Sequence, residues 1–275
     1  MLSLTNQFHP ITAAPFRHDA SYCEAAPCDL LKPYIRCFWG TQSIIETETV
    51  LDNSIVIPDV CMDIIFEICH NQCHSVFVGI ADCSHTAGSV CTSVGSSVFG
   101  IRFYAWTAVL FAERDMYGTK NGCFSADMFF SSIQKEIEPF LYDIPDLQGR
   151  IAVTESILMQ RMCTSQIHAD FLNAVQYVLH TNGRAKVADI CSDTAVSERT
   201  LERMFLHNMG ISPKLFSSLV RYQLLWQDLV YHPETCLLDA VEKYGYTDQP
   251  HLLHDFRKRH QMTPRRALEF AQKNR

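Results

Sequence analysis

The sequence predicts an α+β protein with a β-rich first part and an all-helical last part. Short β-branched or aromatic segments dominate the first 125 residues, and apolar residues adopt three- and four-residue spacing near Ser125. A pattern of helix, tight turn and helix then occurs twice after residue 186. We therefore expect a β-rich domain at 1–125, a helical connector at 126–165 and an all-α domain at 166–275.

Four segments of the first part have the composition of strands. Each is short, rich in β-branched or aromatic residues, and bounded by Asp, Asn, Gly or Ser. The segments are "SIVIP" (54–58), "CMDIIFEIC" (61–69), "SVFVGI" (75–80) and "SSVFGIRFY" (96–104).

The connector is expected to contain two helices, in 126–144 and 151–162. The first carries an apolar stripe at helical spacing. Its members are Phe129, Phe130, Ile133, Ile137, Phe140 and Leu141. This stripe either packs on its own β-rich domain or forms a dimer interface, and the sequence leaves both interpretations open.

The first helix-turn-helix pattern lies in "KVADICSDTAVSERTLERMF" (186–205). A short helix is followed by a turn near Thr194–Val196 and by a second helix, for which the Ser197 hydroxyl can accept a backbone N–H. Apolar residues on the facing sides would pack where the helices cross. Arg199, Glu202 and Arg203 then lie on the exposed face of the second helix.

The second pattern lies in "LLDAVEKYGYTDQPHLLHDFRKRH" (237–260), with a turn at Gly245 and a cap at Thr247 or Asp248. Between the two patterns, a helix over 212–230 begins with Ser212 as cap and Pro213 in its first turn. A helix of this length spans about 27 Å. It can therefore hold two recognition helices near the ~34 Å spacing of successive major grooves.

These features carry a family resemblance. "VSERTLERMF", "GISPKLF" and "YGYTDQPHLLHDFRKRHQMTPRRAL" resemble the DNA-binding domain of the AraC/XylS family of bacterial transcription regulators. "LKPYIRCFWG", "VIPDVCMDIIFEI" and "GIRFY" resemble a cupin-like sensor domain found in some members. The resemblance implies a regulator that binds promoter or operator DNA and responds to a small-molecule, redox or metal signal.

Three residues depart from the family pattern. Ala195 stands where Gly is frequent, which is tolerable if Ala195 stays out of the left-handed region. His254 stands where Arg is frequent, and Pro250 follows Gln249 directly. Because both changes reduce hydrogen bonding by the second recognition helix, we expect base reading to depend more on the first unit.

Two sets of residues suit contact with DNA. Arg199 and Arg203 can each bind guanine O6 and N7, and Glu202 can accept from a cytosine amine; the alternative is a solvated helix face with an Arg–Glu pair. The full set of expected contacts is Ser197, Arg199, Glu202, Arg203, Gln249, Leu253, His254, Arg257 and Lys258. "RKRH" (257–260) and Arg265–Arg266 suit either phosphate contacts or a helix dipole.

Composition is consistent with this interpretation. Hydrophobic residues make up 47% and charged residues 19%, as in soluble globular proteins. Residues 1–167 carry 9 Lys and Arg against 18 Asp and Glu, whereas residues 168–275 carry 14 against 12. This asymmetry fits either nucleic-acid binding or two solvated surfaces of different charge. The sequence shows neither a signal peptide nor an apolar membrane span, so we expect a cytoplasmic protein.

The stretch "EICHNQCHSV" (67–76) places two Cys and two His close together. A three-residue loop, in preference to a two-residue one, keeps one face of the hairpin apolar and sets Cys69 opposite Cys73. Opposed positions lie within or near disulfide range, so both thiols are sensor candidates as a redox or metal-responsive pair. A purely structural role is the alternative, and the metal question stays open.

The resemblance favours a regulator over an enzyme, and it assigns neither catalytic residues nor a cofactor. The rival hypotheses are a metal-dependent cupin enzyme and a DNA-repair methyltransferase module, each fused to a DNA-binding domain. No His-x-His motif supports the former, and the Cys spacings of the latter are not apparent. The expected partners are duplex DNA, an effector of unknown identity, RNA polymerase if the protein is an activator, and a second copy of the chain.

Overall fold

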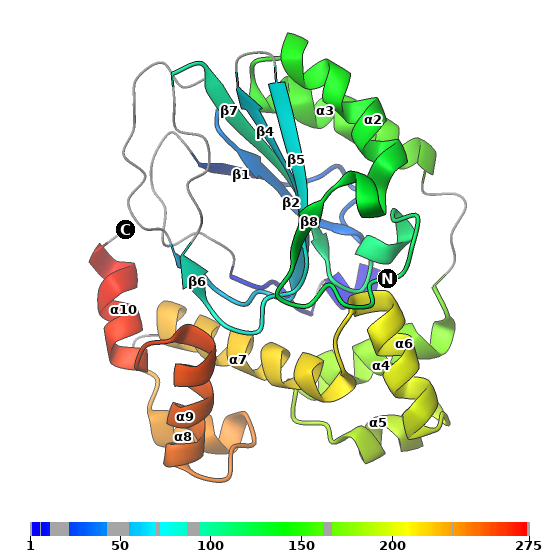
Figure 1. Ribbon diagram of the computed structural model, residues 1–275. Helices are drawn as coiled ribbons and strands as arrows, with labels where there is room; N and C mark the ends of the chain where they lie inside the picture. Colours follow the sequence, from blue (N-terminus) through cyan, green and yellow to red (C-terminus); the bar gives the residue numbers. More distant parts are fainter. Residues whose placement is uncertain are drawn as a thin grey trace.

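The structure is a computed structural model that describes residues 2–5, 7–11, 22–42, 55–69, 72–86, 94–161, 167–232 and 234–273. The predicted α+β class is confirmed. A six-stranded antiparallel sheet forms the first part, and a layer of helices beneath it forms the last part (Figure 1). A short helix, α1 (Leu2–Thr5), precedes the sheet.

The large sheet has the strand order β1-β2-β7-β4-β5-β8. Its strands are β1 (Cys23–Ala25), β2 (Ile35–Gly40), β4 (Cys61–Cys69), β5 (Gln72–Val78), β7 (Ser96–Tyr104) and β8 (Cys123–Ser125). The segments 61–69 and 96–104 therefore form strands over their full predicted length. Of the predicted segment 54–58 the structure describes 55–58, and within that part only Ile55–Val56 is a strand, β3, which pairs with β6 (His85–Thr86) in a separate two-stranded sheet.

The β4–β5 hairpin differs from the expected register by one residue. Cys69 pairs with Gln72 and Ile68 pairs with Cys73, so the predicted opposition of Cys69 and Cys73 is wrong. The predicted loop residues His70 and Asn71 lie outside the described residues. A one-residue slip moves every side chain of a strand to the opposite face of the sheet.

Burial of Phe77 explains the observed register. Its ring lies 4.8 Å from that of Phe129 and 5.0 Å from that of Phe130, on the face covered by helix α2 (Asp127–Asp143). The expected register would instead have buried Val76 and Val78 and would have moved the Phe77 ring to the opposite face of the sheet, away from the two aromatic rings of α2.

The connector consists of α2 and α3 (Leu147–Arg161), which lie against one face of the sheet (Figure 1). Phe129, Phe130 and Ile133 are buried there, so this part of the predicted stripe packs on its own domain. Phe140 is 46% exposed. Helix α2 is kinked at Phe130, whose backbone angles are not helical, and contains a proline near its end.

The helical layer contains both predicted helix-turn-helix units. After α4 (Ala169–His180), the first unit consists of α5 (Val187–Thr194) and α6 (Glu198–Met209). The second consists of α8 (Leu237–Lys243) and α9 (Gln249–His260), followed by α10 (Pro264–Lys273). The 19-residue helix α7 (Pro213–Tyr231) joins them, so that the units lie at its opposite ends (Figure 1).

Helix α7 is buried over more of its surface than one stripe accounts for. The side chains of Leu219, Tyr222 and Trp226 are fully buried, and so are those of Phe216 and Val220. The Phe216 ring meets that of Trp106, which belongs to the N-terminal domain, at 6.2 Å. One continuous core therefore joins the sheet to α7.

Candidate nucleic-acid interface and interior of the N-terminal domain

The predicted cap of the first recognition helix is confirmed. Ser197 Oγ accepts a hydrogen bond from the Thr200 N–H at 3.2 Å, which satisfies one N–H of the first turn of α6. The cap fixes the direction in which α6 leaves the turn.

The exposed face of α6 presents three of the expected DNA contacts. Arg199 and Arg203 are exposed and Glu202 is half-buried. Within the described part of the chain, none of these three side chains forms a hydrogen bond or an ion pair, so the alternative of an Arg–Glu pair is not observed. The donors of both guanidinium groups are therefore available to an external acceptor.

The turn of the first unit is strained. Ala195 has φ 55° and ψ 29°, which is the left-handed conformation. Ala195 was expected to be tolerable only outside the left-handed region, so this condition is not met. The Cβ of an L-residue makes that conformation unfavourable. The equivalent turn of the second unit has Gly245 at φ 65°, where no such cost arises.

The second recognition helix is capped by Asp248, whose Oδ1 accepts a hydrogen bond from His251 N–H at 2.7 Å. Pro250 lies in the first turn of α9, where its missing N–H breaks no helical hydrogen bond. The remaining expected contacts lie on one side of this helix. His254, Arg257 and Lys258 are exposed, whereas Gln249 and Leu253 are half-buried.

Only part of the basic segment 257–260 can contact phosphate. Arg259 and His260 are buried, so the expectation of phosphate contacts is wrong for these two residues. Arg259 instead donates from Nη1 to the carbonyl of Asp82 at 2.9 Å and from Nη2 to Ser218 Oγ at 3.0 Å. It joins the second recognition helix to the N-terminal domain. Arg265 and Arg266 are exposed.

The first recognition helix is also attached to the N-terminal domain. The carbonyl of His207 in the last turn of α6 accepts a hydrogen bond from Met116 N–H at 2.9 Å. Gly210, which ends α6 at φ 68°, lies so close to the Met116 carbonyl that a Cβ would be 2.3 Å from its oxygen. Only glycine fits this approach without displacing the backbone.

The two cysteine candidates do not form a facing pair. In the observed register Cys69 and Cys73 lie on opposite faces of the sheet. Burial, together with Glu138, raises the pKa of the Cys73 thiol to about 12. Because reactivity requires the thiolate, Cys73 is a poor redox group in this environment. The geometry that motivated a thiol switch is therefore absent.

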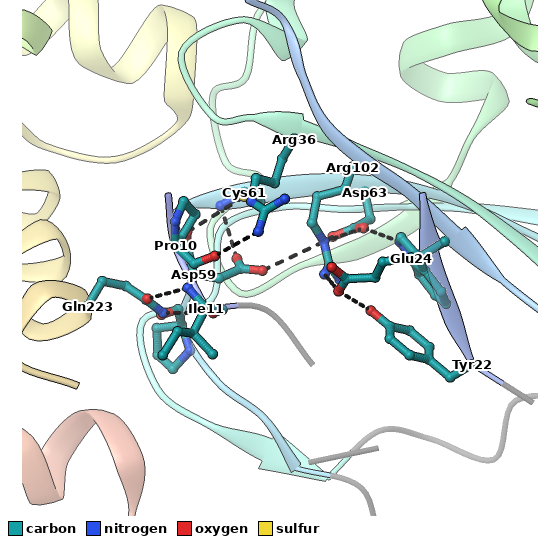
Figure 2. Close-up of polar contacts among 12 residues, drawn as sticks. Pro10, Ile11, Tyr22, Glu24, Arg36, Asp59, Cys61, Asp63, Arg102 and Gln223 are labelled. Carbon is teal, nitrogen blue, oxygen red and sulfur yellow. Dashed lines mark hydrogen bonds and ion pairs between the residues drawn. The ribbon is translucent and has the colours of Figure 1, made fainter. Parts of the chain in front are cut away.

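A charged cluster in the interior of the N-terminal domain was not predicted. Asp63 Oδ1 accepts hydrogen bonds from Trp39 Nε1 at 2.7 Å and from Arg102 Nε at 2.9 Å (Figure 2). Arg102 Nε is 3.7 Å from Asp59 Oδ2, and Arg102 Nη1 is 3.7 Å from Glu24 Oε1. We call these five residues the Arg102 cluster.

The Arg102 cluster is almost closed to solvent. The side chain of Arg102 is 6% exposed, and those of Asp63 and Asp59 are 12% and 13% exposed. Buried charges of this kind are stable only when they are paired and hydrogen bonded. The neighbouring Cys37 and Cys61 thiols are held protonated, because burial raises the pKa of both.

A single signal in the sequence points to this cluster. Arg102 is the only charged residue of the predicted strand 96–104, and Asp63 is one of the two charged residues, with Glu67, of the predicted strand 61–69. Strand β4 pairs with β7 so that these two residues are directly opposite each other. The strand order that creates this pair is a long-range property that spacing along the chain does not show.

Neither a metal site nor a membrane span is found in the parts of the chain that the structure describes. No group of three or more His, Cys, Asp or Glu side chains there is arranged to hold a metal ion. None of the described helices combines the length and the apolar character needed to cross a bilayer.

Comparison with known families matches two parts of the chain. Residues 190–269 match a family of helix-turn-helix domains, and residues 23–125 match a family described as a domain of unknown function (DUF6597). The first match runs from within α5 to within α10, and the second covers the sheet. No curated protein sequence matches the chain.

The chain is distantly similar to solved structures of ToxT from Vibrio cholerae. ToxT from strain O395 is 12% identical, with 85% of this chain and 98% of that chain covered and a TM-score of 0.39. A ToxT structure bound to (E)-4-(8-methylnaphthalen-1-yl)but-3-enoic acid is 10% identical, with 85% and 99% covered and a TM-score of 0.41. Wild-type ToxT bound to an unsaturated fatty acid, from strain SCE256, is 11% identical, with 92% and 97% covered and a TM-score of 0.37. Similarity at this level transfers no residue role.

Proposed function

We propose that this DNA-binding transcription regulator, whose C-terminal part is an AraC-type helix-turn-helix domain, reads duplex DNA with α6 and α9 under the control of its N-terminal domain. The observation that carries the proposal is the pair of capped recognition helices at the two ends of α7. A 19-residue helix is about 28 Å long, which suits two successive major grooves on one side of DNA.

Arg199 and Arg203 are the base-reading residues in this proposal. Both are exposed on α6 and have no partner among the described residues, so binding guanine breaks no interaction within the protein. An arginine that donates two hydrogen bonds to O6 and N7 is the commonest specific contact in the major groove. Ser197 precedes them as the N-cap of α6, and Glu202 lies between them in the sequence.

Helix α9 mainly positions the protein on the DNA duplex. Arg257 and Lys258 are exposed near its C-terminus and suit phosphate oxygens, which carry no sequence information. Gln249, Leu253 and His254 are the base-facing residues of this helix, and among them His254 is exposed and the other two are half-buried.

The effector is proposed to act through the N-terminal domain. The Arg102 cluster gives the interior of this domain polar groups that a small hydrogen-bonding molecule can engage. RNA polymerase and a second copy of the chain are the further partners proposed for a cytoplasmic regulator of this kind. The exposed Phe140 ring on α2 is the surface we assign to self-association.

The proposal is tested with the full chain and DNA selected from a random duplex library. Enrichment of a defined sequence is expected. Arg203→Ala should then weaken binding to that sequence by about 1–3 kcal/mol and leave binding to random DNA nearly unchanged. Lys135→Ala, which removes an exposed charge on α2, is the matched control and should change neither.

Two outcomes contradict the proposal. Failure to enrich any sequence would show that the chain is no sequence-specific DNA-binding protein. Equal losses on selected and random DNA would show that Arg203 contacts phosphate and does not read bases.

A further inference from the structure

Gln223 lies at the middle of α7, between the two helix-turn-helix units, and is completely buried. Its Oε1 accepts a hydrogen bond from Ile11 N–H at 3.0 Å, and its Nε2 donates to the carbonyls of Ile11, at 3.2 Å, and of Pro58. All three bonds go to the backbone of the N-terminal domain (Figure 2). Since each would leave a buried polar group unsatisfied if broken, this contact fixes α7 firmly against two separate segments.

The segment that Gln223 holds is a strained turn. Val60 is buried and has φ 60°, a conformation that is a true outlier for a β-branched residue. Such a conformation persists only when more than one surrounding contact holds it in place. Here the surroundings are two hydrogen bonds: Asp59 Oδ1 accepts Cys61 N–H at 3.0 Å, and the Val60 carbonyl accepts Ala105 N–H at 3.1 Å.

The same turn is tied to the Arg102 cluster. The second oxygen of Asp59 faces Arg102 Nε, which is hydrogen bonded to Asp63. Asp59 thus uses one oxygen to hold the turn and the other to meet the guanidinium group (Figure 2). In addition, Arg102 Nη1 has no hydrogen-bond partner among the described residues, so the group can be drawn toward a new acceptor.

We propose that the Pro58–Cys61 turn is a joint that transmits the state of the Arg102 cluster to α7, with Gln223 as its positioning residue. A change in the contacts of Arg102 with Asp59 and Asp63 shifts the backbone of the turn. The hydrogen bond between the Pro58 carbonyl and Gln223 then transmits that shift to α7. Because α7 carries a recognition helix at each end, its position sets how the two helices meet DNA. Only this last step rests on the proposed function.

The joint is tested without DNA by hydrogen exchange in the full chain. Gln223→Met removes the three hydrogen bonds at nearly constant length. Asp59→Asn keeps an acceptor for Cys61 N–H but removes the charge that faces Arg102. Gln227→Met is the matched control, because Gln227 lies one turn further along α7 and also donates to the N-terminal domain, at the carbonyl of His9, but does not contact the turn.

Transmission is expected in both directions. Gln223→Met should speed exchange of the Cys61 and Ala105 amides about tenfold or more, although Gln223 bonds to neither. Asp59→Asn should speed exchange of the Ile11 amide, which Gln223 holds, by a similar factor. Gln227→Met should change these amides less than twofold.

A strictly local response would overturn the proposal. If Gln223→Met speeds only the Ile11 amide, and Asp59→Asn only the Cys61 amide, the turn transmits nothing. Should Gln223→Met fail to fold, Gln223→Glu gives the same test, because it keeps the acceptor for Ile11 N–H and loses the donor to Pro58.

DNA binding by the same variants separates this inference from the proposed function. Gln223→Met should change the ratio of affinities for paired and single half-sites at least fivefold, while Gln227→Met should not. An unchanged ratio would show that the joint does not reach the recognition helices. Absence of sequence-specific binding by the wild type would contradict the proposed function and leave the exchange result standing.

Discussion

The backbone N–H of Ser84 donates to the carbonyl of Arg259 at 2.6 Å, and so connects the loop before β6 to the last turn of the second recognition helix. The guanidinium group of the same arginine returns to this loop through the carbonyl of Asp82. Two neighbouring basic residues, Lys258 and Arg259, therefore have different tasks. One faces solvent and the other holds the helix to the N-terminal domain.

Arg259→Ala should lower the free energy of unfolding by about 2–3 kcal/mol, because it removes two hydrogen bonds of a charged group and leaves the partly buried carbonyl of Asp82 without this donor. Lys258→Ala should stay within about 0.5 kcal/mol of wild type. On DNA, Lys258→Ala should weaken binding to all sequences alike and reduce the salt slope by about 1. Urea titrations and salt-dependent affinities measure both. Equal stability losses in the two variants would refute the assignment.

The two recognition helices should contribute unequally to sequence reading. Base substitutions in the half-site read by residues 197–206 should cost more than substitutions in the half-site read by 247–258. The reason is that α6 offers two exposed arginines without partners among the described residues, whereas α9 offers a half-buried Leu253 and an exposed His254. A saturation scan of the selected site measures this. The opposite asymmetry would show that α9 is the principal reader.

Ala195→Gly should stabilise the protein by about 1 kcal/mol, because Ala195 has the left-handed conformation at an exposed turn. Gly245→Ala, at the corresponding turn of the second unit, should destabilise it by a similar amount. Thermal or urea unfolding of the two variants gives the comparison. Loss of stability in Ala195→Gly would mean that the methyl group makes a contact that outweighs the strain.

Asp59 should make stability fall as pH rises. Burial, with the neighbouring Asp63, raises the pKa of Asp59 to about 6, although Arg102 opposes the shift. The native state therefore favours the protonated carboxyl. This contribution to stability is complete below the unfolded pKa, near 4, and is lost as pH rises through 6.

Between pH 4 and pH 7 the wild type should lose on the order of 2 kcal/mol relative to Asp59→Asn, which cannot titrate. Urea titrations of both proteins at the two pH values measure the difference, in which the other ionisable groups cancel. Identical pH dependence in the two proteins would show that folding does not raise the pKa of Asp59.

Local patterns predicted the secondary structure where local chemistry determines it. Ser197, Ser212 and Asp248 cap their helices as expected, because a side-chain oxygen next to the first turn acts within a few residues. Their β-branched and aromatic content, between Asp, Asn, Gly or Ser residues, predicted β4 and β7 over their whole length.

The features that the sequence did not predict depend on packing between residues far apart in the chain. The register of β5 depends on whether Phe77 or its valine neighbours face α2, a helix that begins 50 residues further along the chain. The pairing of Asp63 with Arg102 depends on strand order. Arg259 looked like a phosphate contact because its interface partners, at 82–84, are about 175 residues away in sequence.

Because α7 is buried on two sides, the two parts of the chain depend on each other for folding. Phe216 and Val220 complete the same core as Trp106 and the sheet, so the matched families at 23–125 and 190–269 are not independent modules here. Excising either half, or exchanging it with that of another regulator, would expose this apolar seam to water. Evolution of a new sensor for this DNA-binding part therefore has to preserve the surface that α7 is packed against, and not merely the length of a linker.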